Sequence, residues 1–360
     1  MRRLLVPVAA VAALCGAFAG CDDGHSGPET SHRRYMMGFS AIPPRPDTSI
    51  VLPTLTLAAQ HSDAGLIQLS IPWTVLLADT AAATEVRVVR LPLVDYYRAT
   101  GRGVVVALDV TDGLNRSAEA PELVAAGRSI TDTAVQRLYR EYVAAVDSIL
   151  RPDYLSLAAE TNLIRLAAPA PVYSALVTMV NAAAQERAVA GSATPLLISV
   201  QVEVAWGRLA GVGGGAFAGI GPDRTDFPFM DALGLSSYPY LGGFADPDSV
   251  PLDYYSRLTS SDPLPVIVLE GGWTSVPAGG TPGSPEMQAR YIGRQARILD
   301  HADAAGLFQI TFTDLQLSAV PLPPGSILPL FAYLGLVDTL LIPKPALAAW
   351  DTVLARPLRP

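Results

Sequence analysis

Short apolar runs recur along the chain and alternate with segments of helical periodicity. Eight such runs are rich in residues that favour strands, and they occupy residues 34–40, 64–73, 103–111, 153–161, 195–206, 230–240, 265–273 and 306–314. Runs that are apolar at nearly every position are typical of strands with both faces buried, as in a parallel sheet. The pattern therefore predicts eight buried strands.

The segments between the runs predict helices wherever their periodicity can be tested. Apolar residues within 131–150 and within 171–190 fall three and four positions apart, so they share one face of a helix. The segment 284–300 begins with Ser284, a favoured N-cap residue, and continues with Pro285 at the first helical position. Strands that alternate with helices predict a parallel sheet covered by helices.

Eight strand–helix units within residues 35–360 predict an α/β fold, the (β/α)8 TIM barrel, in a single domain. A doubly wound sheet is the competing architecture, and it would carry a glycine-rich phosphate turn after its first strand. The sequence there is GFSAIPPRPD, which contains no such turn. The glycine run at 211–223 follows the fifth strand and lacks a Lys-Ser/Thr ending, so we expect segment 207–229 to be a mobile loop.

The N-terminal residues predict export from the cytoplasm. Residues 1–20 combine a basic start with a short apolar stretch, as a secretory signal does. The stretch AFAGC that ends at Cys21 resembles the lipobox of bacterial lipoproteins, which implies that Cys21 carries a lipid. Residues 21–34 are polar and aperiodic, and we expect a flexible tether there. The chain would then be anchored to a membrane of the bacterial cell envelope, on its extracytoplasmic side.

Composition narrows the possible partners and cofactors. The net charge is −8 and no basic cluster follows the N-terminal region, so we expect no nucleic-acid partner. Cys15 would be removed with the signal and the chain has only four histidines, two of them in the tether. These numbers disfavour metal sites built on thiolates or clustered histidines. We expect no metal and no cofactor, and we expect the chain to be a monomer.

Two glutamates stand out at the predicted strand ends. In a TIM barrel the carboxyl-terminal strand ends form one rim, where catalytic groups lie. Glu160 and Glu270 would reach this rim from the fourth and seventh strands. Cleavage of a glycosidic bond needs two carboxyl groups, and aromatic rings that stack on sugars would assist it. We expect sugar contacts from the rim residues Trp73, Asp109, Asp112, Asn162, Trp206, Tyr240, Trp273 and Asp314.

The motifs at these strand ends resemble those of clan A, a large group of retaining (β/α)8 glycoside hydrolases. LSLAAETN matches the position of the family's acid/base glutamate, and PVIVLEGGW matches that of its nucleophile. The resemblance implies that Glu160 is the acid/base and Glu270 the nucleophile. LGLSSYPY is similar to the family's sixth-strand segment, which implies that Tyr238 donates a hydrogen bond that keeps Glu270 ionised.

Two positions depart from the pattern of this family. Ala159 stands where the family usually has an asparagine that binds the sugar 2-hydroxyl, and Asn162 could supply that contact instead. The eighth strand usually supplies a tryptophan platform, whereas ITFTDLQ offers only Phe312 or Asp314. Both departures bear on which sugar the site would accept.

The sequence thus predicts a retaining glycosidase that cleaves β-glycosidic bonds of a polysaccharide or oligosaccharide. A catalytically inactive, carbohydrate-binding envelope lipoprotein on the same barrel is the main alternative, because loss of the chemistry would leave the fold unchanged. A barrel enzyme of unrelated chemistry is less favoured, since the rim lacks histidines, lysines and a phosphate loop.

Overall fold

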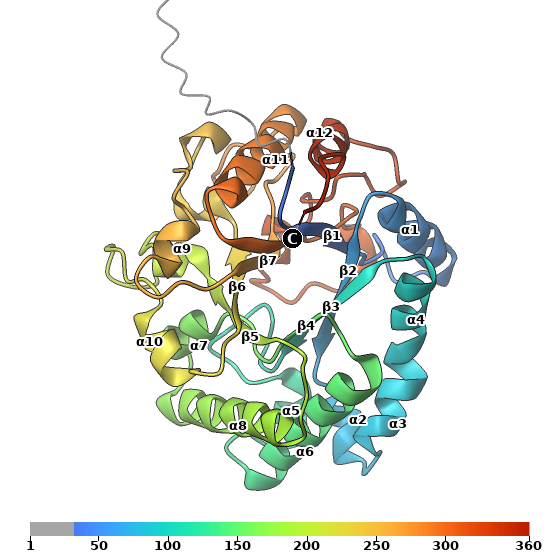
Figure 1. Cartoon of the computed structure of the whole chain (residues 1–360), viewed down its shortest axis with the longest axis vertical. Coiled ribbons are helices and arrows are strands. Elements are labelled where there is room, and N and C mark those ends of the chain that lie inside the picture. The colour runs from blue at the N-terminus through green and yellow to red at the C-terminus, as the bar shows by residue number, and fades with distance from the viewer. Residues whose placement is uncertain (1–31, 360) are drawn as a thin grey trace, which may run out of the picture. The chain divides into compact units, whose positions relative to one another are not determined.

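Eight parallel strands close into a barrel in the computed structural model, which describes residues 32–359 (Figure 1). Each strand pairs with the next along the chain, and the last pairs with the first. The strands are β1 (Met36–Ser40), β2 (Ala64–Ser70), β3 (Gly103–Asp109), β4 (Tyr154–Ser156), β5 (Leu196–Gln201), β6 (Ala232–Ser237), β7 (Val266–Gly271) and β8 (Ala304–Gln309). The predicted (β/α)8 barrel is confirmed.

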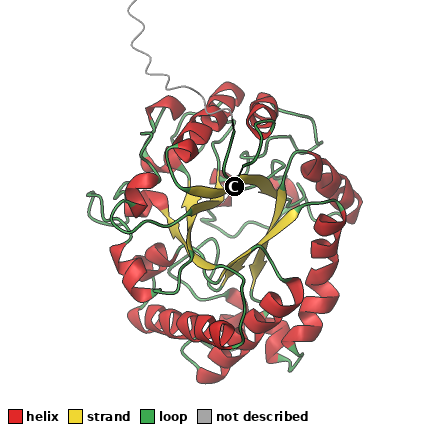
Figure 2. Ribbon diagram, in the orientation of Figure 1, coloured by secondary structure: helices red, strands yellow, loops and turns green. Residues whose placement is uncertain are grey.

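Helices surround the barrel on its outside (Figure 2). The α-helices are α1 (Thr48–Gln60), α2 (Trp73–Leu77), α3 (Ala82–Glu85), α4 (Leu91–Ala99), α5 (Pro121–Ala125), α6 (Thr133–Ala145), α7 (Thr161–Ala167), α8 (Ala170–Val189), α9 (Val202–Ala205), α10 (Gly221–Asp226), α11 (Pro285–Asp300) and α12 (Pro345–Leu354). The three helices predicted from periodicity correspond to α6, α8 and α11. Ser284 caps α11 as expected, because its side chain accepts a hydrogen bond from the Met287 amide at 3.2 Å.

Short helical segments of other kinds extend or join these elements. Two π-helical turns follow directly on α3 and α6, at η1 (Val86–Arg90) and η2 (Val146–Leu150). Single 3-10 turns lie in the connections after β6 and β8, at η3 (Pro239–Gly242), η4 (Pro247–Ser249), η5 (Ser256–Thr259), η6 (Leu317–Ala319) and η7 (Leu328–Leu330).

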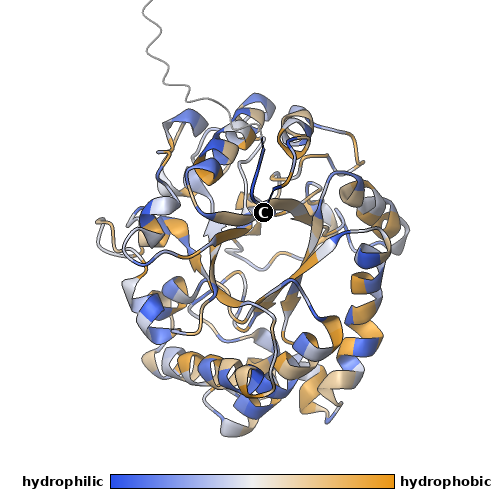
Figure 3. Ribbon diagram, viewed as in Figure 1, coloured by the Kyte–Doolittle hydropathy of each residue, from blue (hydrophilic) through white to orange (hydrophobic). Residues whose placement is uncertain are grey.

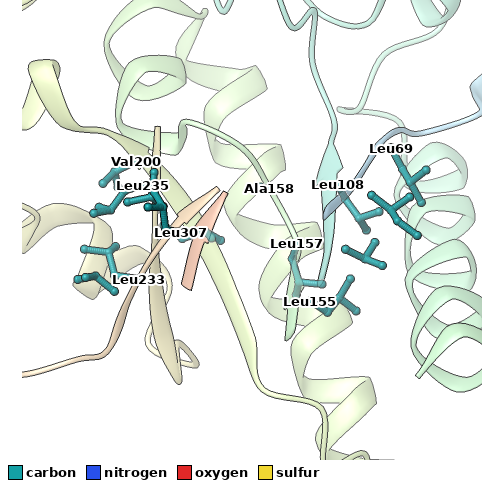
Figure 4. Packing of buried hydrophobic residues seen from close by; sticks show 14 of the residues in the cluster. Leu69, Leu108, Leu155, Leu157, Ala158, Val200, Leu233, Leu235 and Leu307 are labelled. Atoms are coloured by element: carbon teal, nitrogen blue, oxygen red, sulfur yellow. The ribbon is translucent and has the colours of Figure 1, made fainter. Parts of the chain in front are cut away.

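The strands are apolar on both faces because each face meets a different part of the core. Outward side chains such as Leu108, Leu155 and Leu235 are buried between the barrel and its helices (Figure 4). Inward side chains such as Ile267 and Phe308 form a separate apolar cluster. Colouring by hydropathy shows largely apolar strands inside a ring of helices of mixed character (Figure 3). Each such buried side chain stabilises the fold by about 1.5–3 kcal/mol relative to exposure.

Several predicted strands are longer than those observed, and the eighth begins two residues earlier than predicted and ends at Gln309 instead of residue 314. The fourth strand ends at Ser156, so Glu160 is not a strand residue but the N-cap of α7. The fifth ends at Gln201, and α9 begins at once. Segment 207–229 is not loop throughout, because α10 lies in it and the buried Asp223 pairs with Arg165 at 2.9 Å.

The described part of the chain starts near the end of the predicted tether. The predicted signal peptide, Cys21 and the tether up to residue 31 lie outside the described residues. Arg33 falls within the predicted tether, but it is buried and pairs with Asp63 at 2.6 Å, so the folded part includes residues of that segment. None of the described helices is long and apolar enough to cross a membrane.

Arg33→Ala should destabilise the domain by about 2–3 kcal/mol, because it leaves Asp63 without its partner and removes hydrogen bonds to the backbone oxygens of Tyr35 and Leu354. Urea unfolding measures the change. Arg34→Ala is the matched control, because Arg34 is exposed. Equal effects of the two substitutions would show that Arg33 is not part of the folded domain.

Candidate active site

A β-bulge turns Glu270 toward the barrel interior. Leu235 of β6 pairs with Val268 of β7, but the next residue, Ser236, pairs with Glu270. The extra residue, Leu269, lies in the interior cluster, so simple alternation would have placed Glu270 on the outer face. Bulges re-aim side chains in this way at functional sites. The strand thus delivers a carboxylate to the barrel mouth.

Two neutral donors hold the Glu270 carboxylate. The Gln68 side-chain amide, from β2, donates to Oε1 at 2.9 Å. The Tyr238 hydroxyl, just after β6, donates to Oε2 at 3.2 Å. Taken as a whole, residue Glu270 is partly exposed to solvent. Both oxygens are therefore oriented, and the contact expected between Tyr238 and Glu270 is present.

Glu160 reaches the same region from a tight turn after β4. Its backbone lies in the left-handed region, with φ of 48°, where a residue other than glycine costs about 1 kcal/mol or more. Its amide donates to Ser199 Oγ at 2.9 Å, which fixes the turn to β5. Strain of this kind is retained where the surroundings over-determine the geometry, and here it aims a carboxylate.

Arg116 joins the acidic groups of the site. Its Nε donates to Glu160 Oε2 at 2.9 Å, and its Nη1 donates to Asp109 Oδ1 at 2.6 Å and to Thr111 Oγ1 at 3.1 Å. Its side chain is only 5% exposed, and its charge also acts on Glu270. The guanidinium of Arg116 thus bonds two carboxylates, Glu160 and Asp109, and acts on a third through its charge.

Burial and the charge of Glu160 raise the pKa of Glu270 above its usual range, while Arg116 and the Tyr238 hydrogen bond act in the opposite direction. The Tyr238 hydrogen bond thus acts in the expected direction, toward ionised Glu270, but it is not the largest influence on that pKa. A hydrogen bond from a neutral hydroxyl does not outweigh desolvation together with a nearby negative charge.

A further carboxylate, Glu203, lies behind this site in α9. It is fully buried, and burial raises its pKa from 4.5 to about 7 against several hydrogen bonds that lower it. Two of these bonds come from the Tyr238 amide at 3.0 Å and the Tyr254 hydroxyl at 2.9 Å.

Five of the predicted sugar-contact residues are packed in the protein instead. Trp73 and Trp273 are fully buried, so neither indole can serve as a platform. Tyr240 is buried and donates to the Leu330 carbonyl at 3.0 Å. The nitrogen and the oxygen of the Asn162 side-chain amide both form hydrogen bonds with the backbone of Gln201. Asp314 pairs with Lys344. The predictions of sugar contacts by these five residues are therefore wrong. Phe312 is also fully buried and supplies no platform.

The three remaining candidates are partly exposed but differ in place. Asp109 lies beside the glutamates through Arg116. Asp112 caps a turn by accepting from the Leu114 amide at 2.9 Å. Trp206 stacks on Tyr254 with the ring centroids 5.0 Å apart. The Arg257 guanidinium lies 4.9 Å from the centroid of the Trp206 ring. Only Asp109 joins the cluster formed by Glu160, Glu270 and Arg116.

Sequence reasoning missed four residues of the site. Arg116 lies in an aperiodic segment and left no signal. Gln68 could have been found, because it interrupts the apolar run of β2 at an inward position. Phe331, from the long connection after β8, is partly exposed and packs on Tyr238 with ring centroids 4.9 Å apart. The sequence shows Glu203 as an acidic residue near the end of the fifth predicted strand, but it gives no sign that this residue is completely buried.

Neither a comparison with protein-family models nor one with curated protein sequences finds a match. Solved structures of glycosidases do share the barrel fold. The exo-β-1,4-mannosidase Op5Man5 from an Opitutaceae bacterium has a TM-score of 0.61 and 17% identity over 90% of this chain and 60% of its own. A GH5_18 enzyme variant from Bifidobacterium longum, in complex with Manb1-4GlcNAc, has a TM-score of 0.58 and 16% identity over 91% of this chain and 80% of its own.

A β-glucuronidase from Ruminococcus gnavus is a third example, with a TM-score of 0.55 and 15% identity over 89% of this chain and 51% of its own. The chain therefore spans about half to two thirds of the mannosidase and the glucuronidase. At these identities the similarity establishes the barrel fold that these glycosidases share with this chain.

Glu203→Gln should change how stability depends on pH. Because the pKa of Glu203 is raised in the folded state, protonated Glu203 contributes to the stability of the fold. This contribution is fully present below the pKa of the unfolded state and is lost as pH rises through about 7. The variant has no such proton to lose, so its stability relative to the wild type should rise by roughly 2.5 kcal/mol from pH 5 to pH 8. Urea unfolding at the two pH values measures this difference.

Glu122→Gln is the control for that experiment, because Glu122 is exposed. A stability difference between wild type and Glu203→Gln that is the same at both pH values would contradict the assignment of a raised pKa to Glu203.

Proposed function

We propose that the chain is a retaining glycoside hydrolase that cleaves β-glycosidic bonds of a polysaccharide or oligosaccharide. The observation that carries the proposal is the network at the barrel mouth, in which Glu160 and Glu270 come from the ends of β4 and β7 and interact with one guanidinium. Two carboxyl groups at one rim of the barrel are what glycosidic cleavage requires.

In the first step, ionised Glu270 attacks the anomeric carbon and forms an ester, while Glu160 gives a proton to the departing glycosidic oxygen. In the second step, Glu160 takes a proton from water, whose oxygen attacks the anomeric carbon and releases Glu270. Two displacements leave the β-configuration unchanged. Tyr238 and Gln68 would hold Glu270 in line during both steps.

Substrate identity is proposed only as a class. The similar structures are named as enzymes acting on β-mannosides and β-glucuronides, which supports a β-linked substrate. Phe331 presents a partly exposed ring beside Tyr238, and an aromatic ring suits the apolar face of a sugar. We further propose that lipid on Cys21 anchors the enzyme outside a bacterial membrane, which labelled fatty acid and a Cys21→Ser variant would test.

A panel of aryl β-glycosides, including mannoside, glucoside and glucuronide, should reveal hydrolysis whose first sugar product has the β-configuration by proton NMR. Glu270→Gln should lower kcat at least 10³-fold with the fold intact by circular dichroism, because no nucleophile remains. An α-configured first product would show inversion and contradict the double displacement.

Glu160→Ala should slow the release of the glycosyl-enzyme, since no base remains to activate water. Added azide needs no base and fits the space left by the side chain, so it should restore turnover and yield a β-glycosyl azide. Mass spectrometry and NMR of the product provide the readout. Glu122→Ala serves as the matched control, because azide should leave its products unchanged.

Arg116→Met should move the acid limb of the kcat/KM profile to higher pH by about one unit. Glu270 must be ionised to attack, and Arg116 lowers its pKa, so loss of the guanidinium raises that pKa further. Arg128→Met is the control, because Arg128 forms a partly exposed pair with Asp132, which is not a member of this network. A limb that stays in place or moves to lower pH would contradict this electrostatic role.

Sugar binding without cleavage is the second candidate function. The ion pair between Arg116 and Glu160 favours it, because a carboxylate held in this way is less free to reach a glycosidic oxygen. Binding of oligosaccharides by calorimetry, together with no turnover of any activated glycoside, would support this alternative over the enzyme.

A further inference from the structure

Glu203 is a carboxylate whose whole side chain is closed off from solvent, behind the proposed catalytic pair. Oε1 accepts from the Tyr238 amide at 3.0 Å and from the Tyr254 hydroxyl at 2.9 Å. Oε2 accepts from the Gln201 side-chain amide at 2.6 Å. Within residues 32–359 no cation forms an ion pair with it. Neutral donors alone compensate this buried acid.

Stability does not account for a carboxylate at this position. A buried acid without a cation costs the fold free energy, and an apolar side chain of similar size would avoid that cost. The three donors surrounding the carboxylate are instead arranged to fix its orientation. The Gln201 amide cannot turn over, because its own oxygen accepts from the Val204 amide at 2.8 Å.

Tyr238 is the residue that connects this carboxylate to the proposed nucleophile. Its backbone amide donates to Glu203, and its hydroxyl donates to Glu270 at 3.2 Å. We propose that Glu203 is a positioning residue, which anchors the Tyr238 backbone so that the hydroxyl stays within bonding distance of Glu270. The proposal rests on the proposed function in taking Glu270 as the nucleophile.

The packing around Glu203 leaves the carboxylate little freedom. Gly242 lies so close that a Cβ added there would come within 2.9 Å of Glu203 Cγ. Tyr254, one of the donors, is itself buried under Trp206 and Phe244. The anchor is therefore rigid, which is what precise placement of a catalytic hydrogen bond requires.

The test is the ionisation of Glu270, followed by carbon NMR of protein labelled at the glutamate carboxyl carbons. Glu203→Ala should raise the pKa of Glu270 by about one unit, because the Tyr238 hydroxyl no longer stabilises the ionised form. Glu203→Gln should not raise that pKa, since its oxygen can still accept from Tyr238 and Tyr254. If Glu203 acted only through its negative charge, its loss would lower the pKa of Glu270. A raised pKa therefore indicates a positioning role, and a lowered pKa indicates a purely electrostatic one.

Tyr238→Phe provides the reference for this pathway. It should raise the pKa of Glu270 as Glu203→Ala does, and the double variant should raise it no further, because both changes remove the same hydrogen bond. A lowered or unchanged pKa in Glu203→Ala, or additive effects in the double variant, would overturn the proposal.

Two features keep the result interpretable. The titration needs no substrate, so a chain without glycosidase activity would still report whether Glu203 controls Glu270. If Glu203→Ala fails to fold, Gly242→Ala takes its place, because the added methyl group displaces the Glu203 side chain. Gly242→Ala should also raise the pKa of Glu270, and no change would count against the proposal.

Discussion

The site depends on holding like charges close together at the barrel mouth. Glu160 and Glu270 repel each other where burial weakens the screening by water, and Asp109 adds a third acidic group. Arg116 is the cation that makes this arrangement tolerable, since it bonds Glu160 and Asp109 and acts on Glu270. Its burial makes that compensation strong, because solvent cannot screen it.

Two local departures from regular geometry aim the carboxylates. The bulge in β7 turns Glu270 inward, and the left-handed backbone at Glu160 directs the chain back toward the rim after a strand of three residues. The barrel can hold such strained features because its strands are packed on both faces. The rigid strands and their irregular ends together position the carboxylates of Glu160 and Glu270.

The apolar runs predicted the barrel because strands buried on both faces leave a clear signal. The two glutamates were also predictable, since acids that end buried runs are rare and costly. The role of aromatic residues was not, because a tryptophan at a strand end can pack under the neighbouring helices, as Trp73 and Trp273 do. Arg116 was missed because its contacts join segments without periodicity, which only the folded chain brings together.

The proposed mechanism depends on a covalent bond between Glu270 and the sugar. The direct test is mass spectrometry of the protein after treatment with an activated 2-deoxy-2-fluoro glycoside of the sugar that it hydrolyses, because the fluorine slows breakdown of the intermediate. We expect the mass of the wild-type protein to increase by one glycosyl group, carried by the peptide that contains Glu270. We expect no such increase for Glu270→Gln. Hydrolysis of the parent glycoside without any trapped adduct, or an adduct on another residue, would contradict the proposed mechanism.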